Sequence, residues 1–190
     1  MNSKLIYLFG KDHEKWVYSD TYLPYVTPEI IANNVIKSAN EHFNGLVDKV
    51  LWDMFAGVGT DAIRFSKVTG RVICTEICKN TYKNLLTNIA KHKVKNVIPH
   101  NIDCKGFNVG CDIIYFDPPW GETFKSGVDF QFSKDILDVA LEAHKRAALI
   151  IKSPFSCTSF EDIFDQSDII PVHGFRQQKL KFLYIRKASV

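Results

Sequence analysis

The chain has 190 residues, of which 46% are hydrophobic, 24% charged and 13% aromatic. This length and balance fit one soluble globular domain and exclude a wholly disordered protein. The formal net charge of +3 excludes a strongly cationic coat for long nucleic acids, although a local basic face stays open. The 14 Phe, 7 Tyr and 3 Trp are more than a core of this size usually needs, which suggests that some rings stack on a ligand.

Targeting and metal signals are weak throughout the sequence. The N-terminal apolar run, residues 5–9, is shorter than the about 7–15 residues of a secretory signal or the about 20 of a membrane helix. The five cysteines are odd in number and include no C-x-x-C pair, which argues against a zinc ribbon and a disulfide framework. We therefore expect reduced, mostly buried thiols in an intracellular protein. The six histidines show no ligand spacing, so no metal site is predicted.

Apolar periodicity and turn residues predict strands that alternate with helices. Thr27 is expected to cap a helix that starts at Pro28 and carries an apolar stripe to Phe43. Strands are predicted at 50–55, 71–75, 97–98, 113–116, 147–152, 169–173 and 180–186, with helices through 62–65, 85–90 and 133–144. This order predicts an α/β fold with a mostly parallel seven-stranded sheet, helices on both faces and a closing antiparallel hairpin.

A glycine turn follows the first of these strands, in Asp53-Met54-Phe55-Ala56-Gly57-Val58-Gly59-Thr60. Glycines at this place let the backbone approach a ligand closely, although the full G-x-G-x-x-G fingerprint is absent because residue 62 is Ala. Glu76 ends the next strand, 17 residues after Gly59, where a carboxylate can bind the two hydroxyls of a ribose. Together they predict a nucleoside-containing cofactor, and Asp103 could accept from its adenine amino group.

The strand at 113–116 ends in Asp117-Pro118-Pro119-Trp120-Gly121. Two consecutive prolines fix the backbone and remove two donors, which leaves carbonyl groups directed into a cleft. The carboxylate of Asp117 and the carbonyl of Pro118 can accept the hydrogens of an exocyclic amine, while Trp120 stacks on the ring. The motif predicts a site for a planar base that carries an amino group.

The two motifs, in this order, resemble class I S-adenosylmethionine-dependent methyltransferases that act on exocyclic amines. Within that class the chain is similar to the trimethylguanosine synthases, from about residue 8 to about residue 186. The likeness is carried by Leu8-Phe9, Asp12, Glu14, an aromatic at Trp16 or Tyr18, Val26-Thr27-Pro28-Glu29, Asp53-x-Phe-x-Gly-Val-Gly, Pro118-Pro119-Trp120-Gly121 and Lys179-Leu180-Lys181. The chain departs from the family at Asp117, where Ser is usual, and at Glu122, where Gly is usual.

The resemblance implies a Rossmann-like methyltransferase fold, in which residues 1–45 form a segment and helix that cover the active site and 46–190 form the core. It implies S-adenosylmethionine as cofactor and methyl transfer to the exocyclic 2-amino group of the 7-methylguanosine RNA cap. The expected partner is capped RNA, without a membrane. The protein is expected to act as a monomer in the nucleus or cytoplasm, of the host cell if the protein is viral.

The site residues are predicted in three groups. The predicted catalytic residues are Asp117, Pro118 and Trp120. The predicted cofactor-binding residues are Asp53, Phe55, Gly57, Gly59, Thr60, Glu76, Asp103 and Asp117. The predicted substrate-binding residues are Trp120, Pro119, Lys152, Trp16, Lys125 and Lys179, with the lysines for the cap triphosphate.

Two other functions stay open. Asp117 is compatible with an adenine 6-amino or ribosomal guanine 2-amino methyltransferase that acts on uncapped nucleic acid, whereas Val26 to Glu29 and the small size argue against it. The third possibility is a cofactor-dependent RNA-binding domain without catalytic activity.

Overall fold

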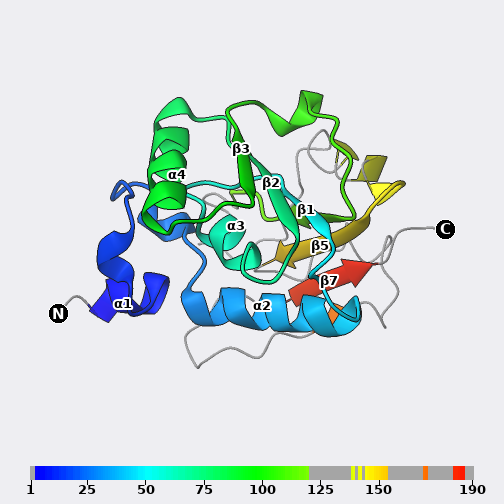
Figure 1. Ribbon diagram of the computed structural model, residues 1–190, viewed down its shortest axis with the longest axis horizontal. Helices are drawn as coiled ribbons and strands as arrows, with labels where there is room; N and C mark the ends of the chain where they lie inside the picture. The colour runs from blue at the N-terminus through cyan, green and yellow to red at the C-terminus, as the bar shows by residue number, and fades with distance from the viewer. Residues whose placement is uncertain are drawn as a thin grey trace, which may run out of the picture.

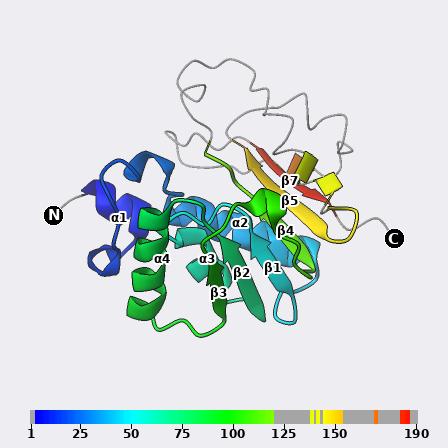
Figure 2. The same cartoon turned by 90° about the horizontal axis from the view of Figure 1, so that it is seen from above.

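A computed structural model describes residues 3–119, 138–139, 141–142, 144–153, 169–170 and 182–186. Within these residues, seven strands form one sheet in the order β3-β2-β1-β4-β5-β7-β6 (Figures 1 and 2). The strands are β1 Val50–Asp53, β2 Arg71–Thr75, β3 Val97–His100, β4 Ile113–Phe116, β5 Ala148–Ser153, β6 Ile169–Ile170 and β7 Phe182–Arg186. Strands β1 to β5 pair in parallel, and β7 pairs antiparallel with both β5 and β6. The predicted mostly parallel sheet and its antiparallel hairpin are confirmed.

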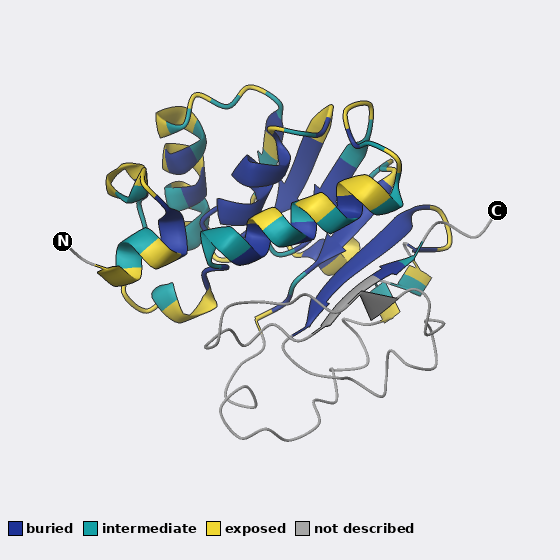
Figure 3. Ribbon diagram, turned by 90° about the horizontal axis from the view of Figure 1, so that it is seen from below, coloured by how far each residue is buried: buried dark blue, intermediate teal, exposed yellow. Residues whose placement is uncertain are grey.

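Bounds are defined for four α-helices and three short 3-10 helices that accompany the sheet. They are α1 Ser3–Phe9, η1 His13–Lys15, η2 Leu23–Tyr25, α2 Glu29–His42, α3 Thr60–Phe65, α4 Lys79–Lys91 and η3 Cys104–Gly106. Helix α2 lies across the sheet with an exposed outer surface, while the central strands are buried (Figure 3). The described residues between 138 and 144 are helical, as expected for part of the helix predicted there.

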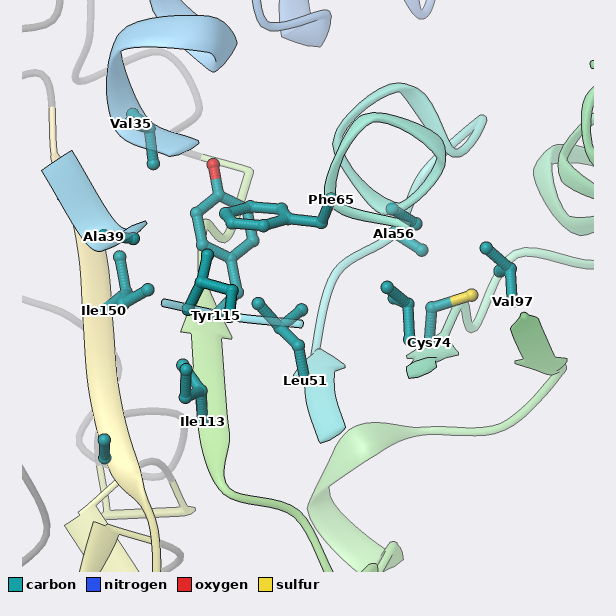
Figure 4. Close-up of a cluster of buried hydrophobic side chains, with 14 of the residues drawn as sticks. Val35, Ala39, Leu51, Ala56, Phe65, Cys74, Val97, Ile113, Tyr115 and Ile150 are labelled. Atoms are coloured by element: carbon teal, nitrogen blue, oxygen red, sulfur yellow. The ribbon is translucent and has the colours of Figure 1, made fainter. Parts of the chain in front are cut away.

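The core explains how helices α2 and α3 are held on one face of the sheet. Val35 and Ala39 of α2 and Phe65 of α3 pack with Tyr115 of β4 and Ile150 of β5, and all are buried (Figure 4). The rings of Phe65 and Tyr115 lie 5.0 Å apart at an interplanar angle of 60°, the edge-to-face geometry that aromatic pairs prefer. This packing places the start of α3 over the carboxyl ends of the central strands.

The start of α2 differs from the prediction. The helix begins at Glu29 after Pro28, and no side chain caps its N-terminus. Thr27, predicted as the cap, instead donates its hydroxyl to the carboxylate of Asp61, 2.8 Å away. A buried carboxylate left without donors costs more than a helix N–H that water can satisfy, so the tertiary bond wins. Strand β1 is also shorter than predicted, because the chain turns after Asp53, whose side chain accepts from the Phe55 N–H.

Candidate functional site

Side-chain alternation gathers ionisable groups at one edge of the sheet. Leu51, Ile113 and Ile150 belong to the core that α2 and α3 cover, so residues two positions further along each strand face the same side. These residues are Asp53, Tyr115 and Lys152, all buried. Phe116 pairs with Ile151 in the parallel register, which brings Asp117 beside Lys152. Asp117 after β4 and the glycine turn after β1 therefore lie at the same edge of the sheet.

The glycine turn has a backbone that only glycine adopts readily. Gly57 and Gly59 have φ angles of +56° and +91°, and Gly59 forms the N-cap of α3. The N–H of Gly57 donates to Oε2 of Glu76 at 3.0 Å, and the N–H of Cys78 donates to Oε1 at 2.7 Å. Burial raises the pKa of the Glu76 carboxyl, and these two N–H groups oppose that rise. Glu76 thus links the end of β2 to the turn.

Tyr22 covers this turn. A Cβ added at Gly57 would overlap the hydroxyl of Tyr22, so the phenol lies directly over the Gly57 backbone. The pKa of the Tyr22 phenol is raised well above its usual value, first by burial and then by the negative charges of Glu76 and Asp117. A residue from the N-terminal segment therefore lies among the carboxylates at the carboxyl-terminal edge of the sheet (Asp53, Asp61, Glu76 and Asp117), which we call the acidic edge. No motif in the sequence indicated this placement.

Asp53 is fully enclosed beneath the turn. Its side chain is 1% exposed and accepts from the N–H of Phe55 at 3.2 Å. Burial raises the pKa of this carboxyl well above its usual value, and the negative charge of Asp61 raises it further. Asp53 would therefore contribute to cofactor binding indirectly, by holding the glycine turn in place.

Because the pKa of Asp53 is raised in the folded protein, its effect on stability should change with pH in the opposite direction to that of most carboxylates. A carboxyl whose folded-state pKa is raised contributes stability at low pH, and that contribution is lost as pH rises toward the folded-state pKa. The variant Asp53→Asn, which keeps an acceptor for Phe55, should therefore unfold at a higher denaturant concentration than the wild type at neutral pH. The difference should shrink toward about pH 4, the usual carboxyl pKa. A stability difference that is constant with pH would contradict the assignment.

A second carboxylate, Asp61 at the start of α3, is the centre of a buried polar network. Its Oδ2 accepts from the hydroxyls of Thr27 and Tyr115 at 2.8 Å and 2.9 Å and lies 3.4 Å from Nζ of Lys152. Its Oδ1 lies 3.8 Å from the guanidinium of Arg64. Burial alone would raise the pKa of Asp61, but Lys152, Arg64 and the two hydroxyls outweigh it and lower the pKa.

Lys152 joins this network to the Asp-Pro-Pro motif. Its ammonium group forms an ion pair with Oδ2 of Asp117 and a hydrogen bond to the Thr27 hydroxyl. The side chains of Lys152 and Asp117 are 9% and 15% exposed. Burial lowers the pKa of the Lys152 ammonium, but Asp117 and Asp61 outweigh it and raise the pKa, so this lysine is charged. With two carboxylate partners, Lys152 is poorly placed to neutralise a substrate phosphate, the role that the sequence suggested.

Arg64 ties the same network to the N-terminal segment. Its guanidinium donates to the carbonyls of Leu8 and Thr27, at 3.0 Å each, although the residue lies in α3. Sequence reasoning missed Asp61, Arg64 and Thr27 as site residues. The signal that was available in the sequence is the i, i+3 spacing of Asp61 and Arg64 in a segment predicted to be helical.

The other predicted site residues differ in burial and in their contacts. Phe55 is half-buried and meets the ring of Phe116 edge-on at 5.3 Å, and Thr60 is buried as the first residue of α3. Pro118 is buried and Pro119 is exposed. Asp103 is exposed and accepts from the N–H of Lys105 at 3.0 Å, which caps η3 just after β3. Three further predictions, Trp120, Lys125 and Lys179, lie outside the described residues.

Trp16 lies apart from the acidic edge. It is 7% exposed, and its ring centroid lies 5.6 Å from that of Phe9 and 4.2 Å from that of His92. It lines a cavity of about 380 Å³ together with Phe9, Lys11, Asp12, Glu29, Ile63, Arg64, Lys67 and His92. None of the predicted cofactor-binding residues lines this cavity, so Trp16 packs the N-terminal segment onto α3 and α4 in this structure.

The geometry at the edge fits a nucleoside-containing cofactor. Glu76 directly follows the neighbouring strand β2 and accepts from the N–H of Gly57, so its carboxylate lies beside the glycine turn that Tyr22 covers. Asp103 follows β3 at the same end of the sheet, because β2 and β3 pair in parallel. Crevices at the carboxyl ends of strands in open α/β sheets are where such ligands bind.

No family model matches the chain. It is 28% identical over 165 residues to an uncharacterized protein of Acanthamoeba polyphaga mimivirus, a match that covers 80% of this chain. The chain spans 62% of the length of that curated relative.

Solved structures share the fold at low identity. A precorrin-6y C5,15-methyltransferase of Geobacter metallireducens has a TM-score of 0.64 at 13% identity, covering 96% of this chain and 98% of that one. A proposed RNA methyltransferase of Pyrococcus horikoshii has a TM-score of 0.62 at 20% identity, covering 92% and 93%. A proposed methyltransferase of Streptococcus mutans, solved with S-adenosylhomocysteine, has a TM-score of 0.57 at 11% identity, covering 84% and 96%. The chain therefore has the Rossmann-like fold of class I methyltransferases.

Membrane-spanning helices and metal-ligand clusters are both absent from the residues that the structure describes. No helix among them is both long and apolar enough to cross a membrane. In the same part of the chain, no three histidine, cysteine or acidic side chains gather as a metal site would require.

Proposed function

We propose that the chain is an S-adenosylmethionine-dependent methyltransferase that modifies the exocyclic 2-amino group of the 7-methylguanosine RNA cap. The observation that carries the proposal is the meeting of the glycine turn, Glu76 and Asp117-Pro118-Pro119 at one edge of the sheet. The Streptococcus mutans protein, solved with S-adenosylhomocysteine, and the RNA methyltransferase proposed for Pyrococcus horikoshii share this fold, which supports the cofactor and RNA as the substrate class.

The residues that would hold the cofactor follow from the contacts. Glu76 would bind the ribose hydroxyls, and Asp103 would accept from the adenine amino group. Gly57 and Gly59 would act by shaping the turn, since Tyr22 and Leu85 occupy the space where their Cβ atoms would lie. S-adenosylmethionine supplies the methyl group from its sulfonium centre. Residues 1–45 would cover the site, a proposal that the position of Tyr22 over Gly57 supports.

The chemistry at Asp117 suits an aromatic amine. Such an amine is a weak nucleophile because its lone pair is delocalised into the ring, so the site must position it and accept its hydrogens. Asp117 and the carbonyl of Pro118 would do this, and the proton leaves the nitrogen to Asp117 or to water after transfer. Trp120 would stack on the base, and the positive charge of 7-methylguanine over its face would gain about 0.5–2 kcal/mol. Lys125 and Lys179 would hold the triphosphate.

The decisive experiment compares two cap dinucleotides, one with and one without the 7-methyl group. We expect transfer of radioactive methyl from S-adenosylmethionine to the methylated cap and about 2- to 30-fold slower transfer to the other, because the uncharged guanine loses the cation–π contact. Product digestion should locate the new methyl on the 2-amino group. Equal rates on both caps, or on uncapped RNA, would overturn the cap assignment.

A second function is favoured by one observation. Asp117, in place of the Ser usual in trimethylguanosine synthases, also suits a methyltransferase for the adenine 6-amino or ribosomal guanine 2-amino group of uncapped nucleic acid. Transfer to uncapped RNA but not to the cap would select it. Cofactor binding without transfer to either substrate would select an RNA-binding domain without catalytic activity.

A further inference from the structure

Lys152 lies where an unpaired lysine would be costly. Its side chain is 9% exposed, and lysine is almost never buried unless it is paired. The pair with Asp117 joins the end of β5 to the end of β4, and the 3.4 Å approach to Asp61 joins β5 to α3. The parallel register next to the pair, Phe116 with Ile151, fixes the position of both side chains. The contact is therefore built into the sheet.

The surroundings of the pair are rich in negative charge. The titratable and charged groups that face it are Asp53 from β1, Asp61 and Arg64 from α3, Tyr115 from β4 and Tyr22 from the N-terminal segment. The charges of Asp61 and Asp117 both act on Asp53 and on the two tyrosines. Arg64 lies nearest Asp61 and uses two of its N–H groups on backbone carbonyls. Lys152 is therefore a cation placed directly against Asp117.

We propose that Lys152 is a positioning residue that keeps Asp117 ionised and oriented as the hydrogen-bond acceptor for the substrate amine. The inference rests on the proposed methyl transfer at Asp117. A carboxyl group among other carboxylates tends to keep its proton, and a protonated carboxyl presents a donor toward an amine that itself needs acceptors. The ammonium group of Lys152 opposes that tendency and holds Oδ2 of the carboxylate in place.

The experiment combines neutral variants of both partners. Lys152→Met removes the charge, and Lys152→Gln removes the charge while keeping a donor for Asp117 and Thr27, in case the Met variant does not fold. Asp117→Asn keeps an acceptor oxygen that needs no cation. Each variant, the Lys152→Met/Asp117→Asn double variant and the corresponding Gln double variant are assayed for methyl transfer to the cap dinucleotide across pH. Circular dichroism and S-adenosylhomocysteine binding by calorimetry report on folding and on the cofactor site.

The expected result is a shift of the acidic limb of the activity profile to higher pH, by at least about one pH unit, when Lys152 becomes Gln or Met. At the lower pH values, kcat falls about 10-fold or more, while KM for the cap changes little. In the Asp117→Asn background the same replacement changes kcat less than about 3-fold, because no carboxylate remains to be kept ionised. Equal loss in both backgrounds, or a pH-independent rise in KM alone, would overturn the proposal.

A readout without catalysis separates this proposal from the proposed function. Carboxyl ¹³C resonances of the wild type and Lys152→Gln are followed by NMR during titration, with Asp117→Asn assigning the Asp117 signal. The Asp117 resonance should titrate at higher pH in Lys152→Gln than in the wild type. If the wild type transfers no methyl group yet this resonance moves, the proposed function fails and the pairing role stands. An Asp117 titration that does not change in Lys152→Gln would overturn the pairing role.

Discussion

Replacing Asp61 by Ala should lower the free energy of unfolding by about 3–5 kcal/mol at neutral pH, the range for breaking one side of a buried ion pair. The substitution leaves Arg64 without its nearby carboxylate and removes the acceptor of the Thr27 and Tyr115 hydroxyls. For a chain of this length such a loss lowers Tm by roughly 6–20 °C. Equilibrium unfolding in urea, followed by circular dichroism, measures it.

The matched control is Asp12→Ala, which breaks an exposed ion pair with Lys15 at 2.9 Å. It should produce no measurable change, because solvent screens an exposed pair. The pH dependence has a definite sign, since the pKa of Asp61 is lowered in the folded state. Its contribution is present above the unfolded-state pKa and is lost as pH falls, so the wild type and Asp61→Ala should converge in acid. If both variants lost the same stability at neutral pH, Asp61 would not be the centre of the network.

Replacing Glu76 by Ala should weaken binding of S-adenosylhomocysteine by about 10- to 150-fold, the equivalent of one or two charge-assisted hydrogen bonds. The carboxylate accepts from the N–H groups of Gly57 and Cys78, so its removal also loosens the turn that presents the ligand. Glu76→Gln keeps one acceptor oxygen and should show a smaller loss. Isothermal titration calorimetry gives both dissociation constants.

The control for this effect is Glu41→Ala, an exposed residue near the end of α2. Its affinity for S-adenosylhomocysteine should match the wild type. If Glu76→Ala bound as tightly as Glu41→Ala, then Glu76 would only brace the turn, and the ribose would have to be bound elsewhere.

The Asp-Pro-Pro motif and the glycine turn could be assigned to strand ends from the sequence, because the residues next to each of them indicate the strand and its end. The apolar run before Asp117 predicts a buried strand, and the consecutive prolines mark its end. The same holds for the glycine turn, whose left-handed φ angles at Gly57 and Gly59 are available to glycine at little cost. Since the carboxyl ends of parallel strands lie along one edge, Asp117 after β4 and Glu76 after β2 lie at the same edge of the sheet, on either side of β1.

The partners of the ionisable side chains could not be placed in that way. Lys152 was predicted near the cleft but assigned to phosphate, whereas it pairs with Asp117 and Asp61, which is 91 residues away along the chain. Thr27 was predicted as a helix cap because only its neighbours in sequence were considered. Trp16 was predicted over the site, yet the packing of α1 and the following segment buries it against Phe9 and His92.

The sequence by itself determined the α/β sheet and the two strand ends at which chemistry is expected. It could do so because the periodicity of apolar residues, the turn residues and the spacing within a motif are local properties of the chain. The tertiary structure alone decided the electrostatic state of the site. Whether a carboxylate such as Asp53 or Asp61 has its pKa raised or lowered depends on burial and on charges from other elements. Those distances are set only when β1, β5 and α3 pack together, so no local pattern could have assigned Lys152 to Asp117.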